Sequence, residues 1–72
     1  MTPQEFKDIR KGLNLTQRAL AHWIDPHAKN KDRDVRRWEA GKYPPPGTVE
    51  TLMLMFGAGY RPLHVSKGEK GG

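Results

Sequence analysis

The sequence predicts an all-α protein: one compact domain of four or five short helices, followed by a disordered C-terminal tail. Three observations lead to this class. Apolar residues recur at helical spacing in four stretches before Tyr60, no stretch has the pattern of a strand, and the residues after Tyr60 are polar and aperiodic. A chain of 72 residues can bury one small core. We therefore expect a domain over residues 1–60 and a flexible tail over residues 61–72.

The first expected helix covers residues 3–12. Thr2 and Glu5 have the spacing of a capping box, in which each side chain accepts a hydrogen bond from the other residue's backbone. Pro3 suits the first helical position, and Gly12 suits the end. The apolar residues of this stretch follow helical spacing: Phe6, Ile9 and Leu13.

The second expected helix begins after Thr16, which is a good N-terminal cap. It ends near Ile24, because Asp25 precedes a proline and is thereby disfavoured in helical conformation. Its apolar stripe would face the core: Ala19, Leu20, Trp23 and Ile24.

The third expected helix ends at about Ala40, where Gly41 follows. Its start is open. Asn30 or Asp32 could cap a short helix, whereas Asp25 with the proline after it could cap one about a turn and a half longer.

The fourth expected helix follows three consecutive prolines, residues 44–46, which form an extended link. Glycines at positions 57 and 59 end this helix. Its apolar residues fall at i, i+3, i+4 and i+7: Val49, Leu52, Met53 and Phe56.

Charge is concentrated in one segment of the predicted domain. Thirteen Lys and Arg against eight Asp and Glu give the chain a net charge of +5. Residues 61–72 carry three basic residues and one acidic residue, and residues 29–42 carry six basic and three acidic residues. All other charges before Tyr60 cancel. A local basic excess of this kind indicates a surface that binds a polyanion.

Several other classes of protein and site are excluded by what the sequence lacks. Without cysteine there is no disulfide framework and no thiolate zinc site, and three scattered histidines do not predict a metal or another cofactor. The longest apolar run, residues 49–56, is too short to span a membrane, and no signal peptide is apparent, so we expect a cytoplasmic protein. The only serine, Ser66, lies in the tail, so we expect no enzyme.

The basic residues of the third helix are predicted to face solvent. With Val35 at the centre of the buried face, Trp38 lies within about 60° of the core direction at 100° per residue. Arg33 and Arg37 lie within about 20° of the opposite direction, and Arg36 flanks them. Two arginines fixed on an ordered helix can reach guanine edges or phosphates.

Glu39 is predicted to project toward the core beside Trp38, where a carboxylate needs a partner. Arg10, next to Ile9 in the first helix, is the best candidate. We therefore expect a structural ion pair between Arg10 and Glu39 that joins the first and third helices.

In order and spacing, the residues resemble the helix-turn-helix DNA-binding domain of the Cro/repressor type, also called the Xre family. The resemblance covers about residues 2–56. It rests on Arg10, on LTQRALA at residues 15–21, on VRRWEAG at residues 35–41, and on the basic, proline-containing link that follows.

The resemblance implies that the third helix lies in the major groove of duplex DNA. Gln17 matches a phosphate-binding position, Arg33, Arg37 and Asp32 match base-reading positions, and Lys42 and Tyr43 match a backbone-binding loop. Arg10 and Glu39 match the family's interhelical ion pair. The expected DNA-binding residues are Gln17, Arg18, Lys31, Asp32, Arg33, Arg36, Arg37, Lys42 and Tyr43.

The chain departs from this family between the second and third helices. Ten residues, 25–34, separate Ile24 from Val35, which is longer than is usual in the family. Either the turn is a longer loop or the third helix is extended at its start. In the second case, Lys29 and Asn30 would also approach the DNA.

The function that we expect is sequence-specific binding of double-stranded DNA by a transcriptional regulator of prokaryotic or phage type. The alternative is a protein-binding adaptor or antitoxin-like partner with the same fold. Family members commonly bind as two-fold dimers. Leu54 and Met55 fall outside the apolar stripe of the fourth helix and are a candidate homodimer surface. No small-molecule ligand is indicated.

Overall fold

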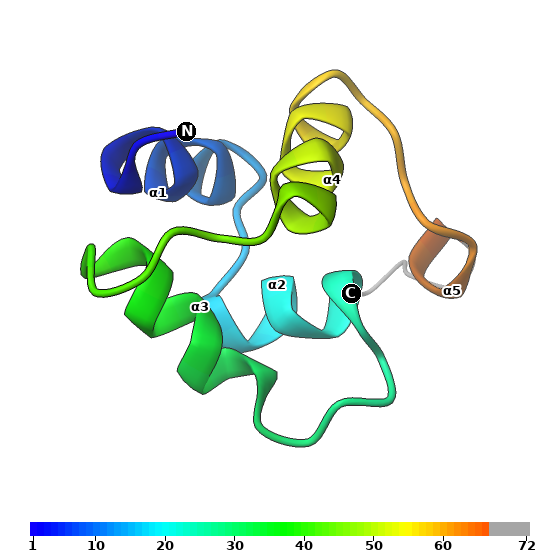
Figure 1. Cartoon of the computed structure of the whole chain (residues 1–72). Coiled ribbons are helices and arrows are strands. Elements are labelled where there is room, and N and C mark those ends of the chain that lie inside the picture. The colour runs from blue at the N-terminus through cyan, green and yellow to red at the C-terminus, as the bar shows by residue number, and fades with distance from the viewer. Residues whose placement is uncertain (67–72) are drawn as a thin grey trace.

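The computed structural model describes residues 1–66. This part of the chain contains five helices and no strands. The helices follow one another through short connections (Figure 1): α1 (Pro3–Gly12), α2 (Gln17–Ile24), α3 (Lys31–Glu39), α4 (Gly47–Gly57) and α5 (Leu63–Ser66). The predicted all-α class is therefore confirmed. The part of the predicted flexible tail at residues 67–72 lies outside the described residues.

The starts of α1 and α2 are fixed by the two predicted caps. Thr2 Oγ1 accepts a hydrogen bond of 3.0 Å from the backbone of Glu5, and Glu5 Oε1 accepts one of 2.8 Å from the backbone of Thr2. Thr16 Oγ1 likewise accepts from the backbone of Ala19 at 3.0 Å. Asp25 is extended, with φ of −152°, and ends α2 where the following proline requires it.

The start of α3 decides between the two alternatives that the sequence leaves open. Asn30 is the N-terminal cap, so α3 is the short helix, and residues 25–30 form a longer loop. The side chain of Asp25 accepts a hydrogen bond of 3.1 Å from the backbone of His27, and its carbonyl accepts one of 3.2 Å from Ala28. These bonds turn the chain directly after α2 instead of beginning a new helix.

Gly41 ends α3 as expected. Its φ of +82° lies in the left-handed region, which glycine adopts without steric cost. The turn allows the backbone of Lys42 to donate a hydrogen bond of 3.0 Å to the carbonyl of Arg37. Lys42 is thereby held beside the last turn of α3.

Side chains from α1 to α4 form one core. Helix α3 packs against both α1 and α2 (Figure 1). The rings of Phe6 and Trp38 lie 5.8 Å apart, and those of Trp23 and Phe56 lie 5.2 Å apart. Each predicted apolar stripe contributes to the core, whose buried residues are Phe6, Leu20, Ala21, Val35, Trp38, Val49, Met53 and Phe56. The other stripe residues are partly buried: Ile9, Leu13, Ala19, Trp23, Ile24 and Leu52. Because two of them belong to α3, this helix is fixed to the body of the protein.

Residues 63–66 form the helix α5. They lie in the stretch that was predicted to be disordered because it lacks apolar periodicity, so this part of the prediction is corrected. The guanidinium of Arg61 lies 5.1 Å above the ring of Trp23 and donates to two backbone carbonyls just before it. His64 Nε2 lies 2.9 Å from the carbonyl oxygen of His22. These contacts join segments far apart in the sequence, so a four-residue stretch cannot reveal them by its own pattern.

Candidate nucleic-acid interface

The structure places the arginines of α3 as the helical wheel predicts. Val35 is completely buried and Trp38 is 6% exposed, whereas Arg33, Arg36 and Arg37 are exposed. The buried pair therefore holds the helix while the three guanidinium groups remain accessible to a partner.

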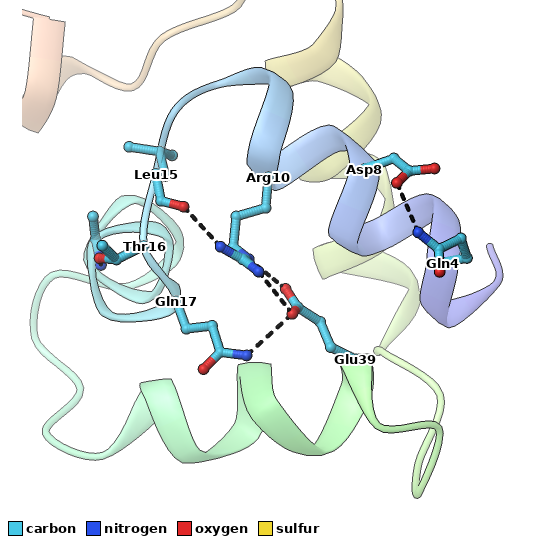
Figure 2. A network of polar contacts seen from close by, with 8 residues as sticks. Gln4, Asp8, Arg10, Leu15, Thr16, Gln17 and Glu39 are labelled. Carbon is cyan, nitrogen blue, oxygen red and sulfur yellow. Dashed lines mark hydrogen bonds and ion pairs between the residues drawn. The ribbon is translucent and has the colours of Figure 1, made fainter.

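The predicted ion pair between Arg10 and Glu39 is present and nearly buried (Figure 2). Arg10 Nε donates to Glu39 Oε2 at 2.6 Å, and Nη2 donates to Oε1 at 3.1 Å. The two side chains are 12% and 3% exposed. Arg10 Nη1 also donates to the carbonyl of Leu15 at 2.9 Å. This network joins α1, the segment before α2 and the end of α3, so it fixes the orientation of the proposed binding helix.

Gln17 belongs to the same network. Its Nε2 donates to Glu39 Oε1 at 3.1 Å, which gives the amide a partner inside the protein (Figure 2). An amide NH₂ group carries two hydrogens, so the other remains for a contact with a phosphate. Gln17 as a phosphate-binding residue stays a prediction, and the structure adds a positioning role.

An open hollow of about 460 Å³ lies between α1 and α3, next to a shallow depression of about 260 Å³ on the outer side of α3. The two share Arg36 and Ala40. Together they are lined by seven basic residues and one carboxylate, Glu39, which is already paired with Arg10. We call the surface of the other six basic residues the basic groove: Lys7, Lys11, Arg33, Arg36, Arg37 and Lys42.

Two of these residues, Lys7 and Lys11, were not predicted from the sequence. In the charge count along the sequence, acidic residues elsewhere in the domain cancel their charges. In the structure, α1 separates its charges between two faces. Its basic side chains line the hollow against α3, and the carboxylates of α1 and α4 line a second hollow of about 400 Å³ between those helices: Glu5, Asp8 and Glu50. The i, i+4 spacing of the two lysines was the available signal.

Other predicted residues lie beside the basic groove or at its edge. Arg18, Lys31 and Asp32 line a separate polar hollow of about 210 Å³ next to the loop 25–30. Lys31 is half-buried, with Nζ 3.7 Å from Asp34 Oδ2 and 6.0 Å from the ring centre of Trp38. These contacts hold Lys31 to the protein.

Tyr43 is exposed and lies beside α3. The guanidinium of Arg37 is 5.9 Å from the centre of its ring. A cation over an aromatic face is held in place by the charge distribution of the ring. Tyr43 is therefore placed to restrict the conformations of Arg37.

Asp32, an unusual residue for a surface that binds a polyanion, is compensated by Arg36. Arg36 Nη1 donates to Asp32 Oδ2 at 3.0 Å. This hydrogen bond lowers the pKa of the Asp32 carboxyl below its usual value. The carboxylate therefore meets a guanidinium one turn along α3, and its repulsion toward a phosphate is reduced.

The lowered pKa of Asp32 predicts how stability depends on pH. The folded state favours the ionised carboxylate, so its contribution is present above the unfolded pKa of about 4 and is lost as pH falls through the folded pKa. Wild type should exceed Asp32→Asn in thermal midpoint near pH 7, and the difference should disappear at acid pH. When Arg36 is replaced with glutamine, the difference in thermal midpoint that Asp32→Asn causes should vary less with pH, because the guanidinium that lowers the pKa of Asp32 is gone. A difference that stays constant from pH 7 to pH 2 would contradict this assignment.

The two predicted dimer residues are exposed on α4, Leu54 by 60% and Met55 by 38%. Leu54 lies at the edge of the acidic hollow beside Glu50. Glu50 is ion-paired with the N-terminal amine, so Glu5 and Asp8 are the carboxylates that a two-fold contact centred on Leu54 would bring toward their copies. The approach of these like charges is unfavourable. Dimerisation through this pair stays a prediction.

Residues 1–66 lack two further kinds of feature. None of the five helices combines the length and the apolar character needed to cross a membrane. No group of three histidine or carboxylate side chains in this part of the chain is arranged to hold a metal ion.

In the comparisons with known proteins, no protein-family model, no curated protein and no solved structure matches the chain.

Proposed function

We propose that this protein binds duplex DNA sequence-specifically, with α3 in the major groove, and that it regulates transcription. The observation that carries the proposal is the rigid attachment of α3, which presents Arg33 and Arg37 on one exposed face. Four residues of helix advance about 6 Å, close to two base-pair steps of about 3.4 Å. Two guanidinium groups at this separation can read nearby base pairs, and guanine offers each of them a bidentate site.

The charge around α3 supports the same partner. The basic groove extends beyond α3 onto α1 and onto the turn that follows α3 at Lys42. Most contacts between a protein and DNA go to the backbone and fix the orientation of the protein. A basic surface wider than the reading helix itself is suited to that purpose. The absence of cysteine fits a reducing compartment such as the prokaryotic cytoplasm, where the DNA lies.

A protein-binding adaptor, the alternative, differs from a DNA-binding protein in its response to salt. A protein that contacts six to ten phosphates loses about 10³ to 10⁵ in affinity between 50 and 200 mM salt. A protein partner that binds through apolar contacts gives a much weaker dependence. The first measurement is therefore affinity for mixed-sequence duplex DNA across this range of salt.

The sharper test is a selection of bound duplexes from a random pool, followed by affinity measurements with Arg37→Ala. We expect the variant to lose preference at one base position, with a cost of about 1 to 3 kcal/mol for the selected sequence. Lys42→Ala is the control, because loss of a phosphate contact should weaken all sequences about equally. An unchanged preference would remove Arg37 from the reading role. Failure of the wild type to enrich any sequence would refute sequence-specific binding.

A further inference from the structure

Lys7 and Lys11 lie one turn apart on α1 and line the same hollow as Arg36 of α3. Lys7 is half-buried and Lys11 is exposed. Neither side chain takes part in an ion pair within the described part of the chain, residues 1–66. Their charges are therefore uncompensated at a place where the protein surface is concave.

The carboxylate in this hollow does not compensate them. Both oxygens of Glu39 accept hydrogen bonds from Arg10, and Oε1 also accepts from Gln17. Arg10 in turn uses Nε, Nη1 and Nη2 for bonds inside the protein. The charges of Arg10 and Glu39 thus neutralise each other, and no carboxylate among residues 1–66 forms an ion pair with Lys7 or Lys11.

Local stability of α1 does not account for both lysines. Lys11 lies in the last turn of α1, where a cation interacts favourably with the helix dipole. Lys7 lies in the middle of the helix, outside that end effect, and a second positive charge four residues later disfavours the helix slightly. An anion between the lysines and Arg36 would reverse that repulsion.

We infer that Lys7 and Lys11, together with Arg36, bind a backbone phosphate of the DNA strand that borders the major groove on the α1 side. The inference rests on the proposed function. Arg36 lines both the hollow and the outer depression of α3, so contacts to this phosphate and to base edges are continuous across the surface. An ammonium is a compact cation with three rotatable donors, which suits a phosphate and carries no base specificity.

The test is the salt dependence of DNA affinity for Lys7→Gln, for Lys11→Gln and for the double variant. Because the site neutralises one phosphate, the slope of log affinity against log salt should decrease by about 1 in the double variant and by less in each single variant. The base preference found by selection should stay unchanged. Thr51→Glu is the matched control. Thr51 is exposed on α4 and lines neither part of the basic groove. Its replacement lowers the net charge of the protein by one, as each single lysine replacement does.

The possible outcomes separate this inference from the proposed function. A reduced slope in the lysine variants but not in Thr51→Glu supports the phosphate site, and retention of the full slope by Lys7→Arg and Lys11→Arg supports it further. Wild-type DNA binding with an unchanged slope in both glutamine variants overturns the phosphate site alone. An equal reduction in Thr51→Glu also overturns it, because net charge then explains the effect. No binding of DNA by the wild type overturns both. Circular dichroism of each variant shows that the helices are retained.

Discussion

Replacement of Arg10 with methionine should remove a large part of the protein's free energy of unfolding. Glu39, only 3% exposed, would then be a buried carboxylate without a cation, which costs about 3 to 5 kcal/mol. A domain of this length has a total stability of roughly 4 to 10 kcal/mol. Urea denaturation, followed by tryptophan fluorescence and circular dichroism, measures the loss directly.

The double variant Arg10→Met/Glu39→Leu provides the control for this prediction. It removes both charges, so no buried ion lacks a partner, and replacement of a buried pair by apolar residues is often nearly neutral. We expect it to be more stable than Arg10→Met alone. If Arg10→Met costs less than about 1 kcal/mol, as an exposed pair would, the ion pair is not the structural connection between α1 and α3.

Replacement of Trp38 with alanine should destabilise the protein by about 3 to 5 kcal/mol. The indole is 6% exposed, and its ring lies 5.8 Å from that of Phe6. Its loss leaves a cavity between α1 and α3 and removes one of the two buried residues that hold α3. Chemical denaturation measures the change, with Tyr43→Ala as the exposed aromatic control, which should stay within about 0.5 kcal/mol.

A milder variant separates stability from function at the same position. Trp38→Phe retains an aromatic ring against Phe6 and should cost less than Trp38→Ala. Under conditions where Trp38→Phe is fully folded, we expect its selected DNA sequence to match that of the wild type, because Arg33 and Arg37 keep their direction. A folded Trp38→Phe protein with an altered base preference would show that the indole itself takes part in recognition.

The sequence alone determined the features that depend on neighbours a few residues apart. Thr2 and Thr16 cap their helices through bonds to residues three positions later, and Gly41 ends α3 with a left-handed φ. The burial of Val35 and the outward direction of Arg33 follow from helix geometry once one face is apolar. Such features could be predicted because they depend on residues only a few positions apart in the sequence.

Only the tertiary structure decided the features that depend on distant partners. Two starts of α3 were compatible with local signals, and the turn formed by Asp25 selected the shorter helix. His64 of α5 contacts α2, and Arg61 just before α5 lies over Trp23 of α2, which no local period reveals. The full extent of the basic groove has the same origin. Charges that cancel along the sequence of α1 point to different faces, so electrostatic potential at a surface depends on three-dimensional position and not on order in the chain.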